Sequence, residues 1–209
     1  FSVPRYEDGY CLDDNARALL LTTMIEDAGT DDRTTTSALS SRYLAFVSHA
    51  WNADLCRFRN FMSYSRAWLE PHGSDDSHGR ALWALGALVG RSREPGRKSL
   101  GSELFHAALP AVCELESPRA SAFALLGIHE FLRAFQGESR VEVLQQRLGE
   151  TLLSRFQRSG ASSDWPWCED VVAYDCARLP QALIVTGDQL GRDDMTTVVL
   201  AQIILEGIK

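Results

Sequence analysis

The sequence predicts an all-α protein built from α/α helical hairpins, with a short β-hairpin in one long loop. Helical periodicity covers most of the 209 residues. Helices that are apolar around much of their circumference alternate with helices that carry one apolar stripe, and a similar polar motif stands before three of the apolar helices. This alternation is typical of a solenoid or toroid, whose inner helices are covered on both sides. We therefore expect one domain over residues 1–209.

The hydrophobic pattern sorts the expected helices into an inner and an outer set. The segment "ARALLLTTMIEDAG" stops at Gly29, and "RALWALGALVG" stops near Gly90. The segment "ASAFALLGIHEFLRAF" is apolar nearly all round, which predicts an inner helix, whereas "VEVLQQRLGETLLSRF" has a charged face, which predicts an outer helix. The expected pairs are residues 14–28 with 32–49, 76–91 with 99–115, 118–136 with 139–158, and 174–187 with 193–207.

Two long loops between the pairs are rich in aromatic residues. The first runs from about residue 50 to 75 and the second from about 159 to 173. Alternating side chains from Arg57 to Phe61 predict one short strand or hairpin in the first loop. Four of the five tryptophans lie in these loops, where a tryptophan either pins the loop to the helices or stacks on a ligand. Both interpretations stay open for each tryptophan.

A polar motif recurs at the start of three inner helices. It is "DDNAR" from Asp13, "DSHGR" from Asp76 and "YDCAR" from Tyr174, so an arginine follows an acidic residue at helical spacing each time. The simplest interpretation is structural, because Asp, Asn and Ser cap helices and acid–arginine pairs stabilise the first turn. One cap needs only one side chain, however, and a buried arginine needs a partner. We therefore expect the motifs to share a polar mouth on one face of the ring.

Composition narrows the classes of partner. The net charge of −7 and the pI near 5.2 argue against nucleic acid and against an acidic membrane surface, since both require a basic stripe. No apolar run approaches the roughly 18 residues of a membrane-spanning helix, and the common cofactor motifs are missing. We expect no cofactor.

The cysteines favour a reducing compartment, which we take to be the cytoplasm. Their number is five, which is odd, and the chain has no C-x-x-C pair. We expect the cysteines to be small buried side chains with free thiols, and we expect no metal. The alternative is a metal site that would have to gather Cys11, Cys56, Cys168 and Cys176, with His78 as a further ligand.

Carboxylates, amides and arginines beside flat aromatic rings suit a sugar, because rings stack on sugar faces while polar groups bind hydroxyls. Glycoside hydrolysis also needs two carboxylates, about 5 Å apart for retention or about 6.5–9.5 Å apart for inversion. The candidate catalytic residues are Asp14, Asp76 and Glu169. The expected substrate-binding residues are Asp13, Arg17, Asn60, Tyr64, Trp68, Asp75, His78, Arg80, Trp165, Trp167, Asp170, Tyr174, Asp175 and Arg178.

Four blocks of the chain carry a family resemblance. They are "GYCLDDNARALLL", "FRNFMSYSRAWLEPHGSDDSHGRALWALG", "SPRASAFALLGI" and "WPWCEDVVAYDCARLPQALIVTG". Together they resemble a bacterial family of α/α-toroid domains described as glycosyltransferases or glycosyltransferase-associated proteins, often encoded beside mannoside phosphorylases. The resemblance implies a six-hairpin-glycosidase-like (α/α)6 ring and a role in carbohydrate metabolism, but it carries no mechanism.

The sequence departs from that family in two respects. The last motif usually reads Y-D-N-A-R, whereas Cys176 takes the place of the asparagine here. The family also continues through two further hairpins, so this chain resembles the first four of six and is expected to form a partial (α/α)6 toroid. The uncovered flanks of a partial ring predict a homo-oligomer that forms through the first or last hairpin.

Three functions are compatible with these observations. The first is a glycoside-processing protein, hydrolase-like or glycosyltransferase-associated, that acts on an oligosaccharide, with mannosides the first candidates, through carboxylate acid/base chemistry. The second is a carbohydrate-binding module without catalysis. The third is a structural helical-repeat module that binds another protein.

Overall fold

The computed structural model describes residues 5–29, 33–159, 167–169 and 171–207, and these contain eight α-helices. The helices are α1 (Leu12–Ala28), α2 (Arg33–Ala50), α3 (Asp75–Arg91), α4 (Pro95–Ala108), α5 (Pro118–Leu132), α6 (Ser139–Ser159), α7 (Arg178–Leu190) and α8 (Asp193–Gly207). Two short 3-10 helices, η1 (Tyr6–Asp8) and η2 (Leu109–Glu114), complete the helical structure. The predicted all-α fold is confirmed.

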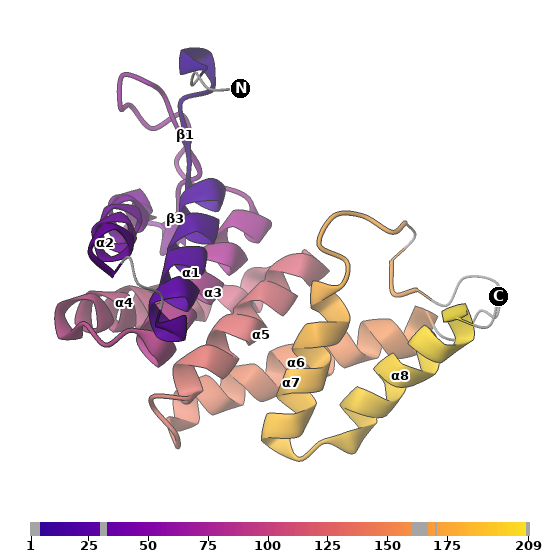
Figure 1. Cartoon of the computed structure of the whole chain (residues 1–209). Helices are drawn as coiled ribbons and strands as arrows, with labels where there is room; N and C mark the ends of the chain where they lie inside the picture. The colour runs from indigo at the N-terminus through magenta and orange to yellow at the C-terminus, as the bar shows by residue number, and fades with distance from the viewer. Residues whose placement is uncertain (1–4, 30–32, 160–166, 170, 208–209) are drawn as a thin grey trace.

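The helices form two rows, as the hydrophobic pattern predicts. In the inner row, α1 packs on α3, α3 on α5, and α5 on α7 (Figure 1). In the outer row, α2, α4, α6 and α8 each pack on the inner helix that precedes them in the chain. None of the described helices is both long and apolar enough to cross a membrane.

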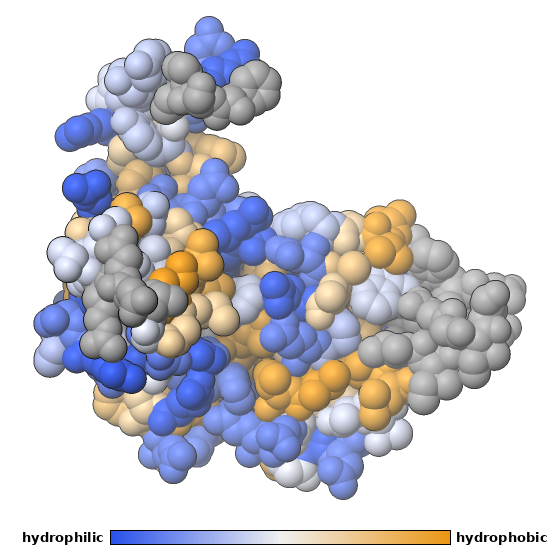
Figure 2. All heavy atoms as spheres, in the orientation of Figure 1, coloured by the Kyte–Doolittle hydropathy of each residue, from blue (hydrophilic) through white to orange (hydrophobic). Residues whose placement is uncertain are grey.

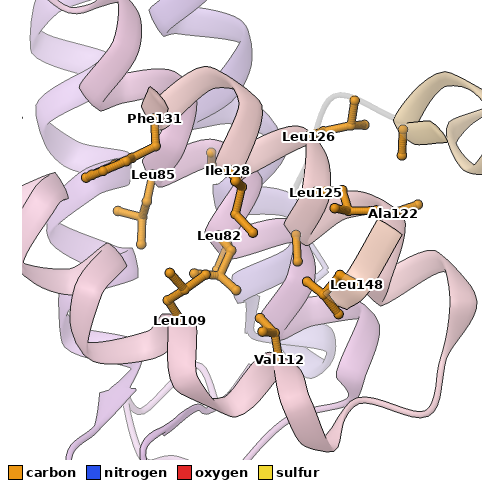
Figure 3. Packing of buried hydrophobic residues seen from close by; sticks show 14 of the residues in the cluster. Leu82, Leu85, Leu109, Val112, Ala122, Leu125, Leu126, Ile128, Phe131 and Leu148 are labelled. Carbon is orange, nitrogen blue, oxygen red and sulfur yellow. The ribbon is translucent and has the colours of Figure 1, made fainter. Parts of the chain in front are cut away.

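The core is deepest between α3 and α5. Both helices are buried along most of their length, because neighbours cover them on two sides. Figure 3 shows Leu82 and Leu85 of α3 facing Leu125, Ile128 and Phe131 of α5. The polar residues at the start of α3 and α5 therefore lie on the most deeply buried pair of helices.

Two short β-ribbons lie in the first long loop and at the N-terminus. β2 (Trp51–Asn52) pairs with β3 (Arg57–Phe58) in an antiparallel hairpin, as expected. β1 (Tyr10–Cys11) pairs with β4 (Phe61–Met62), a contact between distant parts of the chain that the sequence pattern does not predict. Figure 1 shows this second ribbon and its loop projecting from the body of helices.

Four expected helix boundaries are wrong by four residues or more. Two of them are the start of α4, at Pro95 instead of residue 99, and the end of α5, at Leu132 instead of residue 136. The helix expected over 99–115 ends at Ala108 and continues as η2, because Pro110 lacks the amide hydrogen that an α-helix would need there. The last inner helix begins at Arg178 instead of residue 174, because Asp175 has a φ of +53° in the turn before it. That left-handed conformation is incompatible with helix and redirects the Asp175 side chain.

Candidate functional site

The start of the inner row carries a network of charges centred on Arg80. This arginine lies in α3 with only 4% of its side chain exposed, and it bonds to Asp13 of α1. Its Nη2 donates to Asp175 Oδ2 at 2.8 Å, and its guanidinium lies 4.1 Å from the centre of the Phe123 ring. One side chain of α3 therefore joins α1 to the segment before α7.

A second set of contacts ties α5 to the same segment. Arg119 Nη2 lies 2.9 Å from Glu169 Oε2, and its Nε donates to the carbonyl of Tyr174 at 2.8 Å. The hydroxyls of Tyr174 and Ser117 both donate to the carboxylate of Asp76. Arg119 is absent from the predicted site, although the serine–arginine pair in "SPRAS" is its signal in the sequence.

These contacts bring together seven of the predicted site residues. We name them, together with Ser117 and Arg119, the mouth cluster. The predicted members are Asp13, Arg17, Asp76, Arg80, Glu169, Tyr174 and Asp175.

The aspartates of the motifs are not the caps of their helices. Ser74 accepts the cap hydrogen bond of α3 and Ser117 that of α5. At the start of α1 the cap is a distant side chain, because Asn60 Oδ1 accepts the backbone N–H of Asp13 at 3.1 Å. The aspartates therefore do not cap α1 or α3, although Asp13 forms the expected i, i+4 pair with Arg17; Asp13 and Asp76 instead bind arginine or hydroxyl groups.

A pocket of about 290 Å³ opens beside the mouth cluster, between α1, α3 and α7. Trp83 and Arg178 face it together with Arg17, Arg80 and Asp175, and apolar side chains of α1 complete the lining. Arg178 lies 5.0 Å from the centre of the Trp83 ring and donates to Gln181 at 2.6 Å. Figure 2 shows hydrophilic surface gathered between α1 and α7. Trp83 is missing from the predicted site because its position in a core helix favours a packing role.

Asp75 has a structural role. Its carboxylate accepts from Arg57 at 3.0 Å and from the backbone N–H of Glu116 at 2.9 Å. Burial by itself would raise the pKa of Asp75, but these hydrogen bonds and one from the Ser117 N–H outweigh it and hold the pKa below its ordinary value. The ionised carboxylate thus joins the first long loop to the connection before α5.

His78 is also structural. The ring is buried, its Nδ1 accepts the backbone N–H of Phe58 at 3.5 Å, and its Nε2 lies 3.1 Å from the carbonyl of Ala108. Burial lowers the pKa of His78 to about 4, so the ring is neutral near pH 7. Both ring nitrogens therefore have partners within the protein.

We expect the free energy of unfolding to fall by about 2 kcal/mol between pH 7 and pH 5 because of His78. Its pKa is lower in the fold, at about 4, than the ordinary value of 6.5. The unfolded chain therefore takes up the proton first as the pH falls between these values, and stability is lost over that window. Urea unfolding at both pH values checks this. His78→Gln should lack the loss, whereas the exposed-site variant His72→Gln should keep it; a wild-type protein equally stable at both pH values would contradict the expectation.

The remaining predicted residues lie outside the mouth cluster. Asp14 is exposed in the first turn of α1, and Asn60 is buried beneath that turn. Tyr64 stacks on Tyr10, and Trp68 packs on Phe46 of α2.

The second long loop is described only in part. Trp167 is buried against Phe156, so it pins the loop to α6. Trp165 and Asp170 lie outside the described residues.

All five cysteines are free thiols, but the expectation that they are buried is wrong, because Cys56 and Cys113 are exposed and the other three are only partly buried. Within the described parts of the chain, no group of three or more His, Cys, Asp and Glu side chains is placed to hold a metal ion. Burial raises the pKa of Cys168 to about 12, so this thiol is unreactive near neutral pH.

Comparison with protein-family models, curated proteins and solved structures finds no match to this chain. The resemblance to glycosyltransferase-associated toroids therefore stays an expectation. The fold and the mouth cluster define the protein as an all-α protein of helical hairpins with an arginine–carboxylate mouth.

Proposed function

We propose that the mouth cluster and the adjoining pocket bind an oligosaccharide. The observation that carries the proposal is the pocket itself, where the partly buried Trp83 ring lies beside Arg178, Arg17 and Asp175. A flat ring supplies apolar contact to a sugar face, while arginine and carboxylate groups offer directed hydrogen bonds to hydroxyls. Salt bridges to Asp13 and Asp175 hold Arg80 in place, so the site is organised before any ligand arrives.

The ion pairs favour binding over catalysis for most of the acids. Asp13, Asp175 and Glu169 each lie within 3 Å of an arginine nitrogen, as the ion pairs with Arg17, Arg80 and Arg119 show. A carboxylate whose oxygens are held by an arginine is fixed in orientation, which suits the positioning of a ligand. These acids suit the orientation of a ligand.

Replacement of Arg178 by glutamine should weaken oligosaccharide binding roughly tenfold, the usual loss when one charge-assisted hydrogen bond is removed. Arg178 borders the pocket. Its guanidinium donates a hydrogen bond to Gln181, and no carboxylate among the described residues pairs with it. Calorimetric titration with mannosides first, then other oligosaccharides, checks this. Arg192→Gln is the matched control, because Arg192 pairs with Asp194 at the start of α8. Equal affinities of the two variants, or no saturable binding by the wild type, would overturn the proposal.

A second candidate function is glycoside cleavage with Asp76 as the catalytic carboxylate. Asp76 is favoured because its partners are two hydroxyls, those of Ser117 and Tyr174, and no arginine pairs with it among the described residues. Acid–base catalysis needs a carboxylate within hydrogen-bond reach of the substrate, and hydroxyl partners can share that carboxylate with a substrate.

If Asp76 is catalytic, Asp76→Asn should lower turnover of a cleaved oligosaccharide by at least about 100-fold, since acid–base groups contribute on that order. Reducing-end release from a panel of mannosides measures it. Asp54→Asn, in the exposed β2–β3 turn, is the control for the loss of one carboxylate. Full activity in Asp76→Asn would exclude this role. A wild-type protein that binds the same sugars without cleaving them would support binding as the only function of the site.

Two further proposals concern the context of the protein. The free thiols support a cytoplasmic location. The exposed Leu200 on α8, the last helix of the row, supports self-association through the last hairpin. A monodisperse monomer by light scattering at micromolar concentration would count against it.

A further inference from the structure

A second pocket, which shares no residue with the pocket beside the mouth cluster, lies between α2 and the β1–β4 ribbon. Its volume is about 660 Å³, which is within the usual range for small-molecule sites. We name it the α2 groove. Its walls are Tyr10, Phe46, His49 and Met62, and two arginines, Arg42 and Arg66, complete the lining.

The rings of the groove form a continuous apolar wall. The Tyr10 and Phe46 ring centres lie 6.3 Å apart, and Trp68 supports the wall from behind at 5.9 Å from Phe46 and 5.4 Å from His49. Met62 adds a polarisable side chain that is almost wholly buried. A flat apolar group is the chemistry that such a wall accommodates.

The arginines give the groove a charge opposite to that of the protein. No carboxylate in the described parts of the chain pairs with Arg42 or Arg66, whereas the arginines of the mouth cluster are paired. The whole chain carries a net charge of −7. Two unpaired guanidinium groups beside an apolar wall therefore form a local site for an anion.

Arg66 is held in a conformation that costs energy. Its φ is +67°, in the left-handed region that glycine or asparagine occupies most readily. The turn is fixed by hydrogen bonds from the Arg66 N–H to the Ser63 carbonyl at 2.9 Å and from the Ala67 N–H to the Ser63 hydroxyl at 3.1 Å. An arginine at a position better suited to glycine indicates that its side chain has a function.

We propose that the α2 groove binds a small organic anion with an aromatic body. The aromatic part lies against Tyr10, Phe46 and Met62, and the carboxylate, phosphate or sulfonate group binds Arg42 and Arg66. The site is separate from the mouth cluster, since the two pockets share no residue. It also accounts for Trp68 of the first long loop, which packs on Phe46 and His49 of the groove.

A pair of fluorescent probes tests the proposal on the whole chain. 1-Anilinonaphthalene-8-sulfonate is an aromatic anion, and N-phenyl-1-naphthylamine is the same ring system without the sulfonate. We expect saturable binding of the anionic probe that weakens with added salt. The double variant Arg42→Gln/Arg66→Gln should lose at least tenfold in affinity for the anionic probe and keep its affinity for the neutral one, whereas Phe46→Ala should weaken both.

The control is Arg140→Gln/Arg158→Gln on α6, which removes the same charge from exposed positions. Equal affinity of the two double variants for the anionic probe, or no saturation in the wild type, would overturn the proposal. Arg66→Gly supplies an independent measurement. The Arg66→Gly variant should have a higher thermal midpoint of unfolding, because the backbone strain is relieved, and a lower affinity for the anionic probe. A lower midpoint with unchanged probe affinity would show that Arg66 serves the turn alone.

Discussion

Replacement of Gly86 by alanine should lower the free energy of unfolding by about 3 kcal/mol, the upper part of the usual range for overpacked cores. An added methyl group at Gly86 would lie 2.0 Å from the carbonyl oxygen of Gly127 on α5. Gly79, two turns earlier on α3, approaches the carbonyl of Ala120 in the same way, at 2.5 Å. The atoms in conflict belong to the backbone, so no side-chain rotation relieves the clash and the two helices must separate.

Chemical denaturation of Gly86→Ala and Gly96→Ala measures this effect. Gly96 lies in the first turn of α4 with no atom within 4 Å of an added methyl group. Alanine there should stabilise the helix by up to about 1 kcal/mol. Opposite signs for the two substitutions would establish close backbone packing of α3 on α5, and equal effects would contradict it.

The second large effect concerns Arg80. Arg80→Met should lower the free energy of unfolding by about 3 kcal/mol, the order expected when one partner of a buried ion pair is removed. Methionine retains much of the apolar packing, but Asp175 loses its arginine and Asp13 loses one of two. The contact that joins α1 to the segment before α7 is lost with it.

Arg17→Met is the matched control, because Arg17 pairs with the same Asp13 but half of its side chain is exposed. Exposed pairs contribute less than about 1 kcal/mol, so this substitution should have little effect. Similar losses in both variants would show that burial does not strengthen the Arg80 pairs. Urea unfolding of the two variants in low and high salt distinguishes these outcomes, since salt weakens the exposed pair more.

Local patterns in the sequence determine the helices and their two rows. The apolar circumference of α5 and the single stripe of α6 follow from residue order alone, so their inner and outer positions could be predicted. The break at Pro110 could also have been predicted, because proline removes the amide hydrogen at that position. The boundary before α7 could not, since the left-handed Asp175 is held by a contact with the distant Arg80.

The candidate site follows the same division. The repeated motifs correctly indicate that acids and arginines gather at the start of the inner helices, because helices in one row present equivalent ends. Which acid meets which arginine is a tertiary property: Arg80 bonds to Asp13 and Asp175, which are 67 and 95 positions away, and Tyr174 reaches Asp76 across 98.

The helical hairpins, their alternation and the kinds of side chain at the mouth can be predicted from residue order, because they depend on local spacing and polarity. The roles of individual residues depend instead on contacts between segments that are far apart in the chain. His78 and Asp75 are held by distant segments, since His78 lies against the carbonyl of Ala108 and Asp75 accepts from the N–H of Glu116. The arrangement of α1, α3 and α7 places Trp83 beside the pocket, and the β1–β4 ribbon brings Tyr10 to a separate groove.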